Sequence, residues 1–479
     1  MARVPAMVSD ETLALSRYMA RALGRRLPSA VVEKAKHHIL DTLAAMVSGS
    51  RLGPGRKAIA FVATLGGVSS RGGEAGIVGT RLAGGAAQVA LANGIMAHAD
   101  ETDDSHLTSH THPGSAIVPA ALAAGEANRS SGRDFLRAVV LGYDVGCRST
   151  KALDVDGFSA TWRSPHSYGG TFGAGAAAGA LFGLDPLKAR HLLSYSAQLA
   201  SGCGSYMHDP GHIEKAFVYA GKSAHNGVLA ASLVANGFTG AIDVFSGERN
   251  FLDAYAAVPH RDALAAELGR RYEVTGTNIK KWTVGSPIQS VLDSVEGLIR
   301  DHGIVADAVA AIEVRMAPRY ARTADNRPFP DVNVQHLTAL MLVDGTATFA
   351  SCHDAARMKD PRILALRRRL RLVPTESLEG LRPARQAIVV IETRDGRRFT
   401  RHTKAVRGTI DNPMGRDEVV AKARDLMSGI LGKARTGRLI DTVLGIENVR
   451  DVRKLRPLLS TPTPKGGSFC GHEATPSVD

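Results

Sequence analysis

One stretch of 16 residues limits how this chain can fold, because it gathers ionisable groups between two apolar segments. Residues 98–113 contain four carboxylates and four imidazoles, from Asp100, Glu101, Asp103, Asp104, His98, His106, His110 and His112. Small apolar residues flank the stretch at 84–97 and 116–124, in the pattern of closely packed helices. Burying a charged group costs several kcal/mol unless it is paired. The stretch therefore favours a proton-transfer site over a solvated acidic loop.

The length of 479 residues exceeds one ordinary hydrophobic core and predicts two domains. Aromatic residues make up only 5% of the chain while glycine is abundant, which favours packed helices over an aromatic-cored sandwich. Four cysteines, Cys147, Cys203, Cys352 and Cys470, show neither CxxC pairing nor metal-ligand spacing. They indicate reduced thiols in a cytoplasmic protein. We expect no signal peptide and no membrane span, since no run of about 18 uncharged apolar residues occurs.

The formal net charge of +13 raises the question of a nucleic-acid partner. The basic residues are mostly dispersed, however, and the one tight run, at 367–371, has no interleaved aromatic residue. We therefore predict a solvated basic face and no nucleic-acid partner. A weaker alternative is that some of these cations bind small polyanions.

Helical spacing of apolar residues recurs through the first half of the chain and returns near its end. It predicts helices at 9–48, 84–98, 115–127, 132–151, 173–182, 187–203, 215–236 and 416–444. A loop is predicted for residues 152–173, which contain scattered Asp, Pro and Gly.

The character of the chain changes near residue 276. Residues 309–316 have the composition of a strand, and 386–393 with 397–402 alternate like a hairpin around Arg394-Asp-Gly. We predict a mainly α fold with a large, discontinuous all-helical domain and an inserted, smaller α+β domain. The helical domain would comprise residues 1–275 and 405–459, the α+β domain would comprise 276–404, and 460–479 would form a disordered tail.

Polar residues in apolar surroundings occur in five patches, at 98–113, 163–170, 208–222, 280–282 and 319–330. Histidine supplies an acid or base near neutral pH, and Lys and Arg bind carboxylates. Tyrosine can pass a proton to a leaving hydroxyl or to a carbanion. These patches hold the groups needed to move a proton beside a carboxylate.

The residues alone leave a metal site open. His98 and Glu101 are spaced i, i+3, and the following Asp and His residues could complete a ligand set for a metal-dependent hydrolase. No HExxH motif is present, and the spacing of residues 98–112 fits no standard ligand set. We therefore predict no metal, and keep the hydrolase as an alternative.

Six segments then follow one another in a recognisable order between about residues 10 and 450. They are Glu101-Thr-Asp103-Asp104-Ser105 before His112-Pro113, His166 before a Gly/Ala-rich helix ending in Phe182-Gly-Leu-Asp, Lys215 before Gly221 and Gly227, Ile279-Lys280-Lys281-Trp282, Tyr320 before Arg327-Pro-Phe-Pro330, and Gly408 before Asn412-Pro413. In this order they resemble the MmgE/PrpD family, which includes 2-methylcitrate dehydratase, cis-aconitate decarboxylase and iminodisuccinate epimerase.

The resemblance implies a helical domain built from both chain ends, a smaller α+β lid and an active site in the cleft between them. It also implies a homodimer that needs no metal or organic cofactor. The site residues carried over are Glu101, Ser105, His112, His166, Lys215, Lys280 and Tyr320, with Asp104 as a near neighbour. Glu101 stands where the family usually has Asp, and Ser105 where it has Thr. One extra residue after Ser105 makes His110 a competitor of His112.

We expect a cofactor-free lyase acting on a di- or tricarboxylic acid, as a 2-methylcitrate dehydratase-like dehydratase or as a decarboxylase. In this hypothesis Lys215, Lys280 and Arg163 hold substrate carboxylates. Either His112 or His166 moves a proton at carbon, and Tyr320 or a histidine protonates the departing or newly formed group. Glu101 and Asp104 would orient the imidazoles. An isomerase or epimerase using the same site, the metal-dependent hydrolase and a non-catalytic binding protein are the alternatives.

Overall fold

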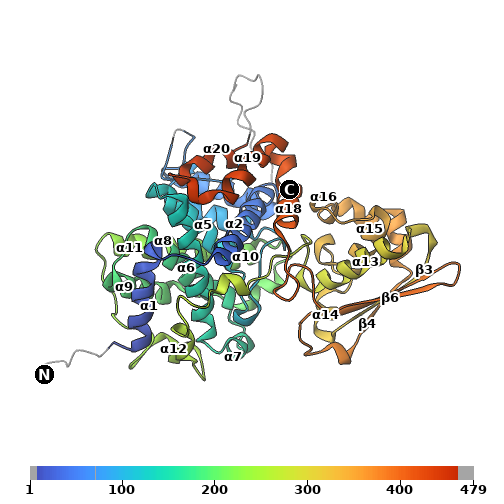
Figure 1. Cartoon of the computed structure of the whole chain (residues 1–479), viewed down its shortest axis with the longest axis horizontal. Coiled ribbons are helices and arrows are strands. Elements are labelled where there is room, and N and C mark those ends of the chain that lie inside the picture. Colours follow the sequence, from blue (N-terminus) through green and yellow to red (C-terminus); the bar gives the residue numbers. More distant parts are fainter. Residues whose placement is uncertain (1–7, 71, 462–479) are drawn as a thin grey trace, which may run out of the picture.

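The computed structural model describes residues 8–70 and 72–461. The predicted disordered tail therefore lies, from residue 462 on, outside the described residues. Helices dominate the described part, and its strands form only two small sheets (Figure 1). The predicted mainly α fold is confirmed. None of the helices within 8–70 and 72–461 is long and apolar enough to cross a lipid bilayer.

The larger hydrophobic core draws its residues from both ends of the chain, between 15 and 279 and between 414 and 459. Its elements are α1 (Asp10–Arg21), α2 (Ser29–Gly49), α3 (Gly53–Thr64), β1 (Ala75–Gly76), β2 (Ala83–Gly84), α4 (Ala86–Ala97), α5 (Pro113–Ala127), α6 (Gly132–Lys151), α7 (Val155–Ala160), α8 (Pro165–Leu181), α9 (Pro186–Leu199), α10 (Ile213–Ala216), α11 (Lys222–Ala235), α12 (Phe251–Tyr255), α18 (Arg416–Leu431), α19 (Lys433–Leu444) and α20 (Arg456–Leu459). The late helix α18 packs against the early helix α2 (Figure 1).

Small residues bring the central helices of this core close together. A Cβ atom on Gly146 of α6 would lie 2.6 Å from the carbonyl oxygen of Gly169 on α8, and one on Gly227 of α11 would lie 2.4 Å from the backbone nitrogen of Gly175. Real Cβ atoms do not approach so closely, because the packed interior has no space to relax. The abundance of glycine in the sequence thus has a direct packing role at these crossings.

A second, smaller hydrophobic core takes its residues from between 282 and 391. Its elements are α13 (Gln289–His302), β3 (Val309–Met316), α14 (Pro318–Ala324), α15 (Val334–Asp344), α16 (Phe349–Cys352), α17 (Pro361–Arg367), β4 (Leu370–Pro374), β5 (Ala387–Thr393) and β6 (Arg398–Thr403). The strands lie in the order β4-β3-β5-β6, with β3 parallel to β4 and all other pairs antiparallel.

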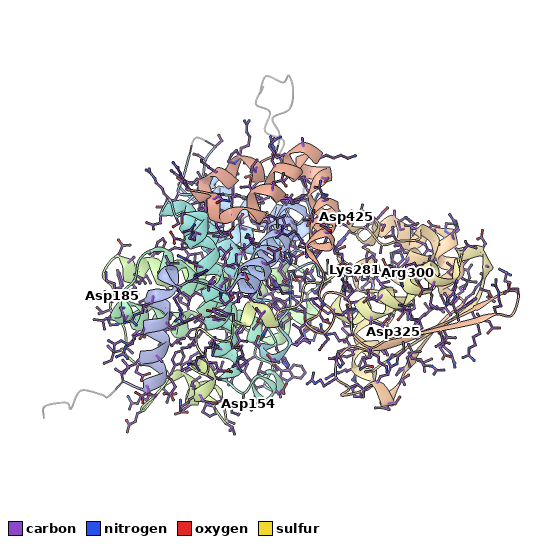
Figure 2. The ribbon with its side chains drawn as sticks, in the orientation of Figure 1. Asp154, Asp185, Lys281, Arg300, Asp325 and Asp425 are labelled. Atoms are coloured by element: carbon purple, nitrogen blue, oxygen red, sulfur yellow. The ribbon has the colours of Figure 1, made fainter. Side chains whose placement is uncertain are left out.

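We call residues 8–279 and 405–461 the helical part and residues 280–404 the sheet part. The labelled residues Asp154 and Asp185 lie on the helical part, whereas Arg300 and Asp325 lie on the sheet part (Figure 2). Asp425 of α18 lies near the junction, where its carboxylate accepts the backbone N–H of Phe349 at 2.7 Å. We propose that the two parts are the predicted domains; their boundaries at 275/276 and 404/405 stay predictions.

Several predicted elements need correction. The predicted loop at 152–173 contains α7 and the first two turns of α8, because Pro165 fits the first position of a helix. The predicted helix at 416–444 is divided at Gly432, whose φ of 80° ends α18 and starts α19. The strand β4 was not predicted, because its five residues are too few to show a period.

Candidate active site

A cavity of about 920 Å³ opens where the helical part meets the sheet part. Of the predicted site residues, those lining it are Glu101, Ser105, His112, Arg163, His166, Lys215 and Tyr320. All of them come from the helical part except Tyr320, which α14 supplies from the sheet part. Asp104 and Lys280 do not line the cavity; both are buried behind its wall.

Another cavity, of about 990 Å³, lies far along the chain around α20. Two of its cations are already engaged: Arg456 pairs with the buried Glu126, and Arg453 pairs with Asp451. None of the described residues that line it is a histidine, the side chain that titrates near neutral pH.

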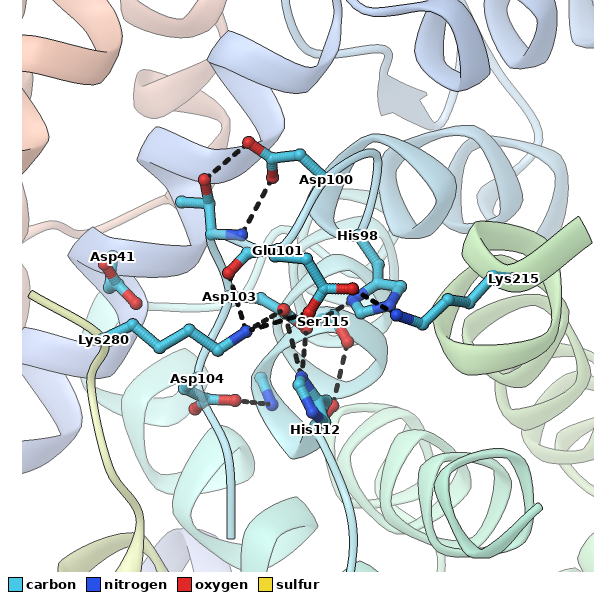
Figure 3. A network of polar contacts seen from close by, with 12 residues as sticks. Asp41, His98, Asp100, Glu101, Asp103, Asp104, His112, Ser115, Lys215 and Lys280 are labelled. Carbon is cyan, nitrogen blue, oxygen red and sulfur yellow. Dashed lines mark hydrogen bonds and ion pairs between the residues drawn. The ribbon is translucent and has the colours of Figure 1, made fainter. Parts of the chain in front are cut away.

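Asp103 is the fully buried centre of the site (Figure 3). Its carboxylate accepts hydrogen bonds from Nδ1 of His98 at 2.8 Å and from Nδ1 of His112 at 3.1 Å. Burial alone would raise the pKa of Asp103, but His98, His112 and Lys280 hold it well below its usual range. Because an ionised carboxylate only accepts, it fixes the proton of His112 on Nδ1 and leaves Nε2 as the basic nitrogen.

His112 and His166 form a close pair of imidazoles, with ring centroids 5.1 Å apart. Burial lowers the pKa of His112 despite the opposing charge of Asp103. Burial, followed by the neighbours His112 and His98, holds the pKa of His166 well below its usual range. Nδ1 of His166 is buried without a hydrogen-bond partner. Both rings are therefore neutral at neutral pH and can accept a proton.

Tyr219 is a site residue that the sequence did not reveal. Its ring stacks on His166 at a centroid distance of 3.7 Å and on His98 at 4.5 Å, so it fixes the planes of both imidazoles. It lies one turn after Lys215, within the π-helical turn Phe217–Gly221. Such turns occur frequently at functional sites.

Glu101 and two lysines form a charged group at the same wall (Figure 3). Lys215 makes a short ion pair with Glu101, and Nζ of Lys280 lies 3.7 Å from the Glu101 carboxylate and 2.7 Å from its carbonyl oxygen. Burial would raise the pKa of Glu101, but Lys215 and Lys280 hold it well below its usual range. Glu101 in turn raises the pKa of Lys215 against the effect of burial. Lys215 and Glu101 therefore keep their charges at neutral pH.

Asp104 does not contact His112 or His166. Its Oδ2 accepts hydrogen bonds from His38 at 2.8 Å and Tyr143 at 2.6 Å, and its Oδ1 accepts the backbone N–H of Gly114 at 2.9 Å. The expectation that Asp104 orients the site imidazoles therefore needs correction, because Asp103 makes that contact. Asp104 instead ties the loop to α2, α6 and the start of α5.

Ser105 and Arg163 are held by contacts to the backbone. Ser105 and Asn278 exchange two backbone hydrogen bonds, of 3.0 and 2.8 Å, which attach the loop to the end of the helical part. Arg163 donates to the carbonyl oxygen of Tyr255 at 2.8 Å, and its guanidinium lies 5.3 Å from the ring of Tyr255. Part of the Arg163 donor set therefore already has a partner.

His110 lies at the rim of the cavity, not in the imidazole cluster. Its side chain is 43% exposed, and Nε2 is 3.5 Å from a carboxylate oxygen of the still more exposed Asp156. His112, by comparison, is 12% exposed and contacts Asp103. This placement favours His112 over His110 as the proton-transfer residue.

Two protein-family models match the chain, one mainly over the helical part and one mainly over the sheet part. The MmgE/PrpD N-terminal domain matches residues 13–262, and the MmgE/PrpD C-terminal domain matches residues 282–446. The chain belongs to the MmgE/PrpD family. The resemblance predicted from the six segments is thereby confirmed.

Named relatives of this MmgE/PrpD protein cover most of its length. It is 26% identical over 471 residues to the cis-aconitate decarboxylase-like protein oryM of Aspergillus oryzae, covering 91% of this chain and 94% of the relative. It is 24% identical over 466 residues to a cis-aconitate decarboxylase of Aspergillus terreus, covering 91% and 93%. It is 26% identical over 391 residues to the human cis-aconitate decarboxylase, covering 78% and 79%.

Two groups in this MmgE/PrpD site have donor atoms close enough for a metal ion. They are His98 with Asp103 and His112, and His98 with Glu101 and His212, each within 4.8 Å. Lys280 lies 3.5 Å from Asp103, and Lys215 is paired with Glu101. A divalent cation bound there would be repelled by these ammonium groups, so the charges fit an ion-pair network better than a metal centre.

Proposed function

We propose that this protein is a lyase that needs no metal or organic cofactor and acts on a di- or tricarboxylic acid by proton transfer beside a carboxylate. The observation that carries the proposal is the pairing of two neutral imidazoles, His112 and His166, with the charged Lys215 in one cavity. The cis-aconitate decarboxylases among the relatives favour loss of CO₂ over the dehydration that the sequence also predicts.

In the decarboxylation, the bond between the leaving carboxylate and its carbon breaks, and CO₂ departs. The electron pair of that bond delocalises into the neighbouring unsaturated carboxylate, and one proton is then delivered to carbon. Binding a polyanion raises the pKa of a nearby imidazole, so His166 or His112 takes up this proton when substrate enters. Lys215 in the cavity lining stabilises the negative charge that develops on the remaining carboxylate, and the buried Lys280 adds positive potential from behind the wall.

Dehydration would use the same groups in another order. A neutral imidazole, His112 or His166, would remove a proton beside a carboxylate. The hydroxyl of Tyr320 would protonate the departing hydroxide, so that water leaves. An epimerase remains the second candidate. Two imidazoles whose ring centroids are 5.1 Å apart could remove a proton from one carbon and return one to its other face, so that no group leaves the substrate.

Turnover of a small substrate panel, with chelator present and no added metal, tests the proposal. The panel holds cis-aconitate, 2-methylcitrate, citrate and iminodisuccinate, followed by proton NMR in deuterium oxide. We expect product from a tricarboxylate, with deuterium at the protonated carbon. Deuterium exchange without product would favour the epimerase. Activity that depends on stoichiometric zinc, manganese or iron would favour the hydrolase.

Two variants distinguish the imidazoles. His166→Ala should reduce turnover about 10²-fold or more, since it removes a proton carrier. His110→Ala, at the rim, is the matched control and should keep turnover within about 3-fold of the unchanged protein. Normal activity in a folded His166→Ala protein would contradict the assignment.

A further inference from the structure

One strong cation of the cavity has no acid to neutralise it. Arg385 lines the cavity from the sheet part, in the segment before β5. Its Nε is buried without a hydrogen-bond partner, and no carboxylate of residues 8–70 and 72–461 forms an ion pair with it. Burial lowers the pKa of this guanidinium, which the Tyr320 hydroxyl beside it opposes. A guanidinium placed this way has N–H donors available to bind an anion such as a carboxylate.

The charges on the opposite wall are already balanced. Lys215 is paired with Glu101, and Lys280 lies close to both Glu101 and Asp103. In the sheet part, Arg319 is paired with Glu379 at 2.8 Å. The lysines can therefore stabilise charge that develops during a reaction, but they hold little excess positive charge for recruiting an anion. Arg163, Arg327 and Arg382 also line the cavity without an ion pair to a described carboxylate. Of these arginines, only Arg385 has a buried nitrogen without a hydrogen-bond partner.

We infer that Arg385 binds a second substrate carboxylate that does not react. The inference rests on the proposed function and narrows it: the substrate presents its reacting end to His112 and His166 and a distal carboxylate to the sheet part. A guanidinium matches a carboxylate with two parallel N–H donors, which a lysine cannot reproduce. Arg385 is thus a specificity-determining residue that selects acids with an additional carboxylate.

Binding of two inert acids tests this role apart from turnover. Tricarballylate carries three carboxylates, and methylsuccinate is the same skeleton with one terminal carboxylate replaced by hydrogen. Neither has a double bond or hydroxyl to react. By calorimetry at about 0.15 M salt, which screens non-specific attraction, the unchanged protein should bind tricarballylate at least about 10-fold more tightly.

Arg385→Gln should weaken tricarballylate binding about 10- to 100-fold and leave methylsuccinate within about 3-fold. Arg385→Lys should recover part of the loss. The control Arg322→Gln changes an exposed arginine of α14 outside the cavity lining and should change neither affinity. Gln and Lys face the same backbone φ of 64° as Arg385, and circular dichroism confirms that the variants fold.

Each other outcome has a defined meaning. Equal weakening of both acids would assign Arg385 to general anion attraction and overturn the inference, as would unchanged binding in Arg385→Gln. A wild-type protein that does not distinguish the two acids would also overturn it. If the distinction depends on Arg385 but no acid of the substrate panel reacts, the binding site stands and only the proposed reaction fails.

Discussion

The ion pair between His353 and Asp100 joins the sheet part to the loop that carries the candidate site. His353 follows α16, and its Nε2 lies 2.9 Å from a carboxylate oxygen of Asp100, with side chains only 12% and 5% exposed. Burial would lower the pKa of His353, but Asp100 raises it from 6.5 to about 9. A shift of this size corresponds to roughly 3 kcal/mol of stability.

The sign follows from the direction of the shift. Because the folded pKa lies above the unfolded pKa, protonated His353 stabilises the fold. Its contribution is fully present below about pH 6.5 and is lost as the pH rises through about 9. Between pH 7 and 10 the unchanged protein should therefore lose roughly 2–3 kcal/mol more unfolding free energy than His353→Gln. Asp331 also faces His353, but burial raises its pKa only to about 6, below this window.

Urea unfolding followed by tryptophan fluorescence measures the effect. Trp282 is 6% exposed in the smaller core and reports its unfolding, whereas Trp162, the other tryptophan, is 79% exposed. Other groups that titrate in this range are common to both proteins and cancel in the comparison. His302→Gln, which changes an exposed histidine stacked on Phe399, should follow the unchanged protein. Parallel loss of stability in His353→Gln and the unchanged protein would refute the reasoning.

Two further substitutions address the buried groups behind the cavity. Asp103→Asn should lower kcat by about 10²-fold or more, because His112 loses the acceptor that fixes its tautomer; Asp156→Asn at the exposed rim should change kcat by less than about 3-fold. Comparable kcat values for the two variants would contradict this role. Lys422→Met should lower the unfolding free energy by about 3–5 kcal/mol, since it leaves Asp41, 2.6 Å away and buried, without its cation. Adding Asp41→Leu should restore part of that loss in urea unfolding, and no recovery would argue against the pair.

The density of charge at residues 98–113 was enough to select a loop that the structure places along the candidate cavity, because buried carboxylates must find partners nearby. It was not enough to separate Asp103 from Asp104. The two neighbours have different partners, and those of Asp104, His38 and Tyr143, are distant from it in sequence. Helical periodicity predicted most long helices, but it does not indicate which helices distant in sequence pack against one another.

Residues of the sheet part that face the cavity were harder to predict. Tyr320 lies in the polar patch at 319–330 and precedes a family motif, whereas Arg385 lies in an irregular segment without any motif. Arg385 is a candidate because its Nε has no hydrogen-bond partner. Such a missing partner can be recognised only when the spatial neighbours of the residue are known. Tyr219 had a possible signal, since it follows Lys215 by four residues and so shares its helical face.

The contact between Lys422 and the loop can form only late in the synthesis of this protein. Lys422 of α18 donates to the carbonyl oxygen of Thr102 at 3.0 Å across 320 residues of chain, and it is also the cation of Asp41. The ribosome therefore synthesises all the histidines, lysines and carboxylates of the cavity, and then the whole sheet part, before it reaches Lys422. A nascent chain that ends before α18 contains these side chains but lacks the Lys422 contacts that hold their loop in position.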